Sequence, residues 1–88
     1  MIVEQQYDFE INFAKIYPDF TCHLVNKVND LTPQEIKVCM LIKMSFSNSQ
    51  IINHLKISKY TLANSRSSIR NKFGMSRDKS LTNFILSI

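Results

Sequence analysis

The stretch that decides the fold runs from residue 47 to residue 75 and reads SNSQIINHLKISKYTLANSRSSIRNKFGM. Ser47 and Ser58 each precede a run with helical spacing, and each can accept a hydrogen bond from the free N–H groups of a first helical turn. Gln50 completes a capping box with Ser47, and Gly74 is placed where a left-handed residue ends a helix. The pattern predicts a short helix and a longer helix joined by three or four residues. They cover about 48–54 and 59–73.

The segment before this stretch carries the same kind of helix-capping signal. In LTPQE, Thr32 can cap the backbone, Pro33 suits the first helical position, and Glu35 completes a capping box. We therefore expect another helix to begin at Pro33. Its apolar residues mark a buried side: Ile36, Cys39, Met40 and Ile42.

The C-terminal residues SRDKSLTNFILSI predict a last helix. Four apolar side chains recur there at spacings of three, one and three, which places them on one helical face. They are Leu81, Phe84, Ile85 and Ile88. We expect this face to support a homodimer through Leu81, Phe84, Ile85 and Leu86.

The first thirty residues are less regular. The alternation of Tyr7, Phe9, Ile11 and Phe13 would suit a strand, but a longer pattern has helical spacing and favours a helix. That longer pattern is Phe9, Phe13, Ile16 and Phe20. Pro18 should break or restart the helix. A second segment from about 18 to 29 then carries Phe20, Leu24, Val25 and Val28 on one face.

Length and composition agree with an all-α protein. Eighty-eight residues suit one compact domain with a small core, which leaves little room for a deep enzyme cleft. One glycine and two prolines disfavour a turn-rich β protein. We expect a helical lead-in of residues 1–30 packed on a four-helix domain of residues 31–88.

Charge is divided between these two parts. Residues 1–30 hold two lysines against five acidic residues, whereas residues 31–88 hold nine Lys or Arg against two acidic residues. The second part is where a polyanion would bind.

Location and chemistry are constrained mainly by what the sequence lacks. It has no apolar run long enough to span a bilayer and no signal-peptide pattern, so we expect a cytoplasmic protein without membrane contact. No catalytic set, phosphate-binding loop or zinc spacing occurs, so we expect neither an enzyme nor a metal or other cofactor. We expect Cys22 and Cys39 to be reduced core residues, and His23 and His54 to have surface or packing roles.

The predicted helix 59–73 has a face suited to DNA. On a helical wheel, Leu62, Ile69 and Phe73 form its inward stripe. Small and amide side chains lie opposite, where they can approach base edges, and hydroxyl and charged side chains lie along both sides, where phosphates border a groove. The outward residues are Tyr60, Asn64, Ser67 and Asn71, with Ala63 beside them, and the residues along the two sides are Lys59, Thr61, Ser68, Arg70 and Lys72. Two helices so joined form the arrangement of a helix-turn-helix.

Arg66 lies near the inward side of this helix. Its aliphatic stem can pack while its guanidinium reaches outward. Two roles stay open for it, which are a contact with a base or phosphate and a salt bridge to the acidic first segment.

With these residues in place, the chain from Leu31 to about Ile88, about two thirds of its length, resembles the LuxR-type (GerE-type) helix-turn-helix transcriptional regulators. The matching text is LTPQE, LI, SNSQII, then L-IS--TL, and then I--KFGM. Ser45 stands where the family commonly has a glycine, and Ala63 and Ser65 are smaller than the usual family residues, so the target sequence does not carry over.

The resemblance implies a four-helix DNA-binding domain of a bacterial regulator, with its third helix in the major groove and its fourth often dimerising. The family's base-facing positions fall on Ala63, Asn64 and Ser67. Its phosphate-facing positions fall on Ser47, Asn48, Thr61 and Lys72. The lead-in also resembles the segment that precedes such domains when they form the C-terminal part of a larger sensor.

A second interpretation belongs to a different class. The chain would then be a helical module that docks an acidic protein, or a sigma-factor-like piece that binds RNA polymerase. An exposed aromatic anchor would favour it, and Tyr60 is the candidate.

Overall fold

The computed structural model describes the backbone of residues 2–76 and 78–88, and the side chains of residues 9–76 and 78–88. In the described chain every regular element is a helix and no β-strand occurs, so the all-α prediction is confirmed. The elements are α1 (Ile2–Ile16), α2 (Phe20–Lys27), α3 (Pro33–Lys43), α4 (Asn48–Leu55), α5 (Lys59–Lys72) and α6 (Leu81–Leu86).

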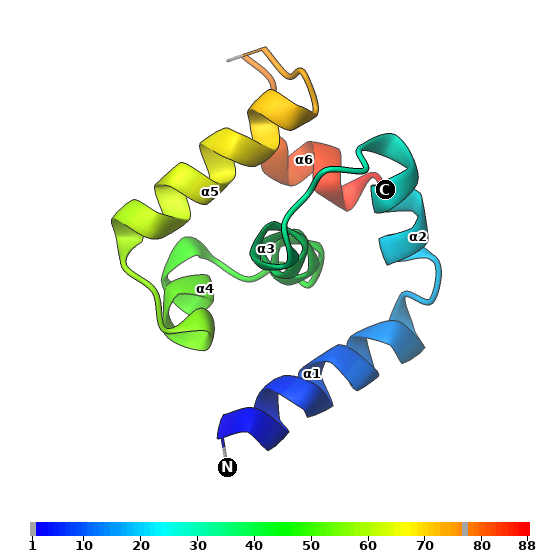
Figure 1. Ribbon diagram of the computed structural model, residues 1–88, viewed down its shortest axis with the longest axis vertical. Coiled ribbons are helices and arrows are strands. Elements are labelled where there is room, and N and C mark those ends of the chain that lie inside the picture. The colour runs from blue at the N-terminus through cyan, green and yellow to red at the C-terminus, as the bar shows by residue number, and fades with distance from the viewer. Residues whose placement is uncertain (1, 77) are drawn as a thin grey trace.

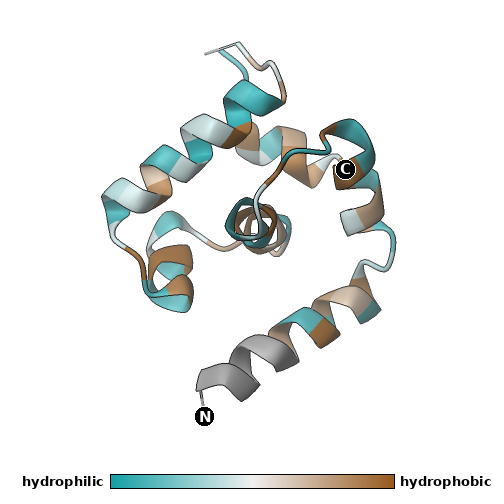
Figure 2. Cartoon of the chain, in the orientation of Figure 1, coloured by the Kyte–Doolittle hydropathy of each residue, from teal (hydrophilic) through white to brown (hydrophobic). Residues whose placement is uncertain are grey.

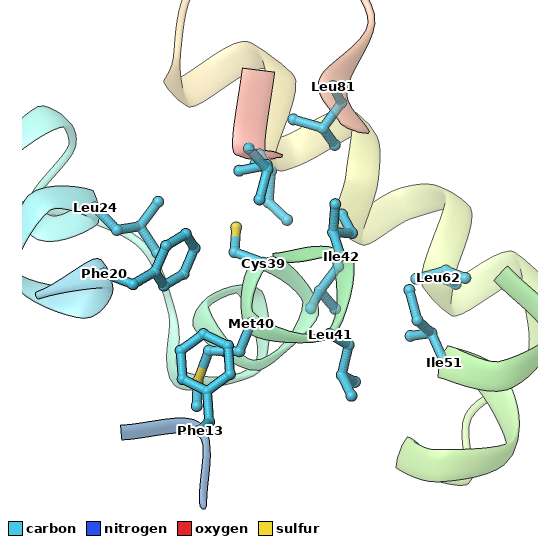
Figure 3. Close-up of a cluster of buried hydrophobic side chains, with 13 residues drawn as sticks. Phe13, Phe20, Leu24, Cys39, Met40, Leu41, Ile42, Ile51, Leu62 and Leu81 are labelled. Carbon is cyan, nitrogen blue, oxygen red and sulfur yellow. The ribbon is translucent and has the colours of Figure 1, made fainter. Parts of the chain in front are cut away.

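Helix α3 is the centre of the molecule. Figure 1 shows it end-on, with the other helices around it. Its consecutive residues from Val38 to Ile42 are all buried, as expected for a helix that has neighbours on several sides. Figure 3 shows Met40 beside Phe13, and Ile51 opposite Leu62. The other helices add these residues to the same core: Phe13, Phe20, Leu24, Ile51, Leu62, Ile69, Leu81 and Ile85.

The predicted helix starts are confirmed. Both capping boxes form, since each cap hydroxyl accepts from the third backbone N–H, at 3.1 Å for Thr32 and 3.2 Å for Ser47, and each third side chain accepts in return. The Ser58 hydroxyl accepts from the backbone N–H of Thr61 at 3.1 Å. These contacts occupy N–H groups that have no partner inside a helix.

Three residues have left-handed backbone conformations. Gly74 follows α5 with a φ of 66°, as predicted. Ser45, after α3, has a φ of 66°, and Lys56, after α4, has a φ of 58°. This conformation costs an ordinary residue about 1–2 kcal/mol, so Ser45 and Lys56 are held there by the packing of the helices that they join.

The lead-in is helical, but two of its residues do not lie where the sequence predicted. Helix α1 ends at Ile16, just before Pro18, and Ile16 is 57% exposed. Tyr17 packs on the core instead, with its ring 5.2 Å from that of Phe13. Cys22 is exposed, so its prediction as a core residue was wrong, whereas Cys39 is buried as expected. Ile16 misses the core because α1 ends there and the helical spacing is interrupted at residues 17–19.

Within the residues that the structure describes, no helix has both the length and the apolar character needed to span a bilayer.

Candidate functional site

Helix α5 presents a polar face. Figure 2 shows it mainly in teal and white, with little of the brown that marks apolar residues. The predicted outward positions and the neighbouring Ala63 are all exposed, the outward positions being Tyr60, Asn64, Ser67 and Asn71. Tyr60 is 75% exposed at the start of the helix. The sequence from residue 58 to residue 76 contains no Asp or Glu, so this face carries no negative side chain of its own.

Packing on the opposite side fixes which way this face points. Leu62 and Ile69 are buried in the core, and the ring of Phe73 lies 4.9 Å from that of Phe84 in α6. The predicted inward stripe is therefore confirmed. A one-residue shift would rotate α5 by about 100° and would bring polar side chains into the core.

The start of α4 lies beside this helix. Ser47 and Asn48 are exposed there, as are Lys59 and Thr61 at the start of α5. A groove of about 300 Å³ runs between the two helices. Its lining consists of Asn48, Ile52, Lys59, Leu62, Ala63 and Arg66.

Lys72, one of the predicted phosphate-facing residues, is held inside the chain. Its ammonium group donates to the Glu35 carboxylate at 2.7 Å and to the Asp30 carbonyl at 2.9 Å. Glu35 is only 5% exposed, and it also accepts from the Thr32 backbone N–H at 2.8 Å. The same carboxylate therefore completes the α3 capping box and ties α3 to the end of α5.

These contacts control the ionisation of Glu35. Burial would raise the pKa of its carboxyl group, but hydrogen bonds from the Lys72 and Ser68 side chains and the Thr32 backbone, with the positive charge of Lys72, outweigh burial and lower the pKa to about 2. Glu35 is therefore ionised at neutral pH, which is the state that Lys72 needs in order to stay bound.

Arg70 is also engaged by the chain. Its guanidinium donates to the Ser76 carbonyl at 2.6 Å and to the Lys79 carbonyl at 2.8 Å. It therefore orders the connection between α5 and α6, and its charge remains near the exposed face. The sequence predicted neither the contacts of Arg70 nor those of Lys72. In both cases the partner residues come close only because of the path that an irregular segment of the chain takes.

Arg66 is half-buried between α5 and α6. Its Nη2 atom donates to the Thr82 hydroxyl at 3.4 Å, which is long for a hydrogen bond. Burial, followed by the positive charge of Arg70, lowers the pKa of Arg66. Among the described residues the guanidinium has this one hydrogen bond.

The last helix uses much of its apolar face inside the chain. Leu81 and Ile85, which were expected to support a homodimer, are buried in the core. Phe84 is partly buried against Phe73, and Leu86 is 41% exposed. In this conformation Leu81 and Ile85 are not accessible to a second copy, because they fill the space between α3 and α6.

Other reactive side chains lie apart from one another. No three His, Cys, Asp or Glu side chains in the described ranges are grouped so that they could hold a metal ion. Burial, with a smaller effect of the Glu35 charge, raises the pKa of the Cys39 thiol to about 12, which makes this thiol a poor nucleophile. His54 packs with Phe9 of α1, with ring centroids 4.9 Å apart.

Comparisons with protein-family models, with curated proteins and with solved structures return no match to this chain.

Proposed function

We propose that this chain is a sequence-specific DNA-binding domain of a bacterial transcription regulator. In this proposal α4 and α5 form a helix-turn-helix, α5 enters the major groove, and α3 to α6 correspond to the four helices of the LuxR-type domains that the sequence resembles. The observation that carries the proposal is the exposed face of α5, which presents small and amide side chains and contains no acidic residue.

The roles on this face follow from side-chain chemistry. An asparagine can pair bidentately with adenine, and a serine hydroxyl can serve several bases, so Asn64 and Ser67 are proposed to read base edges. Lys59 and the start of α4, at Ser47 and Asn48, are proposed to contact phosphates. Arg70 and Lys72 have partners within the chain, so their proposed contribution is to order the end of the helix that carries the DNA-facing side chains.

The test is selection of bound duplexes from a random pool, followed by affinity measurements. Replacing Asn64 by Ala should relax the preference at one base position, by about 1–3 kcal/mol of discrimination. Replacing Lys59 by Gln should weaken binding to all duplex sequences equally. It should also reduce the slope of log affinity against log salt concentration by about 0.9. Absence of any duplex binding at about 50 mM salt would refute the proposal, because non-specific contacts are strongest at low salt.

Tyr60 supports a second candidate function. A side chain of this size that is 75% exposed is the kind of aromatic anchor that protein interfaces use. The chain would then dock an acidic protein or RNA polymerase through the start of α5. Recovery of a protein partner that survives nuclease treatment and is lost with Tyr60→Ala would favour this function over DNA binding.

A further inference from the structure

The groove between α4 and α5 combines an apolar floor with a positive rim. Ile52, Leu62 and Ala63 provide aliphatic surface, and Lys59 and Arg66 provide the charge. Asn48 adds an amide at the α4 end, and no acidic side chain is among the lining residues. An occupant that matches this lining has a negative group and a compact apolar part.

The two flanks of the α5 face differ in charge. On one flank the ammonium of Lys72 is 2.7 Å from the Glu35 carboxylate, so its charge is largely balanced. The other flank carries Lys59, Arg66 and Arg70, which point in similar directions on the helix and are spaced by about 10 Å and 6 Å along its axis. Arg70 is held in the α5–α6 connection, where it donates to two carbonyl groups and has the Asp78 carboxylate nearby, so the charge at the groove itself comes from Lys59 and Arg66. The positive potential is therefore concentrated on the groove side.

Arg66 is the member of this flank whose position is most favourable for an anion. Its guanidinium is half-buried, and its described hydrogen bond, to Thr82, is long at 3.4 Å. A guanidinium that has lost part of its hydration and has donor groups in excess binds a phosphate strongly, since both charge and hydrogen bonds are then satisfied.

We infer that the α4–α5 groove binds one sugar–phosphate strand of the DNA duplex, with a phosphate at Arg66 and a neighbouring deoxyribose on the aliphatic floor. This inference rests on the proposed function and adds to it which flank of α5 faces the strand. A DNA strand suits the groove because deoxyribose is compact and largely apolar between charged phosphates. The base-reading residues Asn64 and Ser67 lie on the adjoining face.

The first experiment measures duplex affinity against salt for the full chain and three variants. Arg66→Gln should lose about tenfold in affinity at 0.1 M salt, equally on unrelated sequences, and its salt slope should fall by about 0.9. Arg66→Lys should keep the slope, because it keeps the charge. Lys15→Gln removes one exposed charge from α1, away from the groove, and should behave like the unaltered chain.

The second experiment needs no change to the groove and so does not depend on how the variants fold. Methyl signals of Ile52 and Ala63, observed by NMR, should shift when duplex is added, while those of Ile11, exposed on α1, should not.

The outcomes separate the two proposals. If the unaltered chain binds no duplex, the proposed function and this inference both fail. If it binds duplex but Arg66→Gln has the slope of Lys15→Gln, or if the groove methyl signals stay unshifted, the inference alone is overturned. A change of sequence preference in Arg66→Gln would also overturn it, because Arg66 would then contact a base. Displacement of the duplex by an acidic peptide that shifts the same methyl signals would assign the groove to a protein partner instead.

Discussion

Ser45 occupies a backbone conformation that glycine adopts at less cost. Its φ of 66° places it in the left-handed region after α3, and the residue is exposed. Replacement by Gly removes a local cost of about 1–2 kcal/mol but adds freedom to the unfolded chain. We expect Ser45→Gly to raise the free energy of unfolding by about 0.5–1 kcal/mol, measured by urea denaturation.

Gly74 provides the control for this prediction. It has the same φ of 66°, and a Cβ added there would meet nothing within 4 Å. Gly74→Ala should therefore destabilise by about 1 kcal/mol through backbone strain alone. Equal stability of both variants and the unaltered chain would show that these two connections relax freely.

The two cysteines should differ sharply in reactivity. Cys22 is exposed on α2, whereas Cys39 is buried and the pKa of its thiol is raised to about 12. A thiol reagent should modify Cys22 within minutes and Cys39 only when the chain unfolds. Mass spectrometry after limited alkylation checks this, and Cys22→Ser should abolish the fast reaction. Rapid modification of Cys39 in the native chain would contradict its place in the core.

At the scale of elements, the ion pair between Glu35 and Lys72 joins the start of α3 to the end of α5. Replacing Lys72 by Met leaves a buried carboxylate without its cation, so we expect a loss of about 2–3 kcal/mol in urea denaturation. Lys37→Met is the matched control, since Lys37 and Glu10 form a more exposed pair at 3.6 Å. Its loss should stay below about 1 kcal/mol. Similar losses in both variants would show that burial adds nothing to the Lys72 pair.

The same pair predicts a pH dependence. The pKa of Glu35 is lowered on folding from 4.5 to about 2, so its contribution to stability is fully present above pH 4.5 and is lost as the pH falls toward 2. The contribution is on the order of 3 kcal/mol. In Lys72→Met this part of the acid dependence should shrink, which denaturation at a series of pH values would measure. An unchanged profile would mean that other carboxyl groups control acid unfolding.

Prediction from sequence succeeded for features that depend only on residues close together in the chain. The caps at Thr32, Ser47 and Ser58 and the end at Gly74 depend on residues within a few positions of each other, and all four are confirmed. The buried stripe of α5 is also a local periodicity.

What sequence reasoning missed depends on tertiary structure. Cys22 was misplaced because helical spacing alone does not say how far the core extends around α2. The partners of Lys72 and Arg70, and the packing of Phe9 with His54, join segments that are distant in sequence or separated by an irregular connection. A lysine near the end of one helix and a capping Glu at the start of another gave no signal that they would meet.

At the scale of the whole molecule, the lead-in and the remaining helices share one core. Phe13 of α1 is 1% exposed, and its ring lies 5.4 Å from that of Phe20, beside Met40 of α3 (Figure 3). Phe13→Ala should therefore cost about 3–5 kcal/mol and lower the melting temperature of the entire chain in a single transition. Circular dichroism measures this, with Ile11→Ala, at an exposed site of α1, as the control. Two separate transitions would instead identify the lead-in as an independent unit.

The contact between Lys72 and Glu35 also restricts how α5 can rotate. Leu62 near one end of the helix and Lys72 at the other hold it at two points, so its rotation about its own axis is fixed. The buried stripe sets the angle at which α5 displays its outward side chains, and a carboxylate on a different helix fixes the far end of α5 at that angle. Substitutions at Glu35 would therefore loosen the last turn of α5 without changing any of its outward side chains.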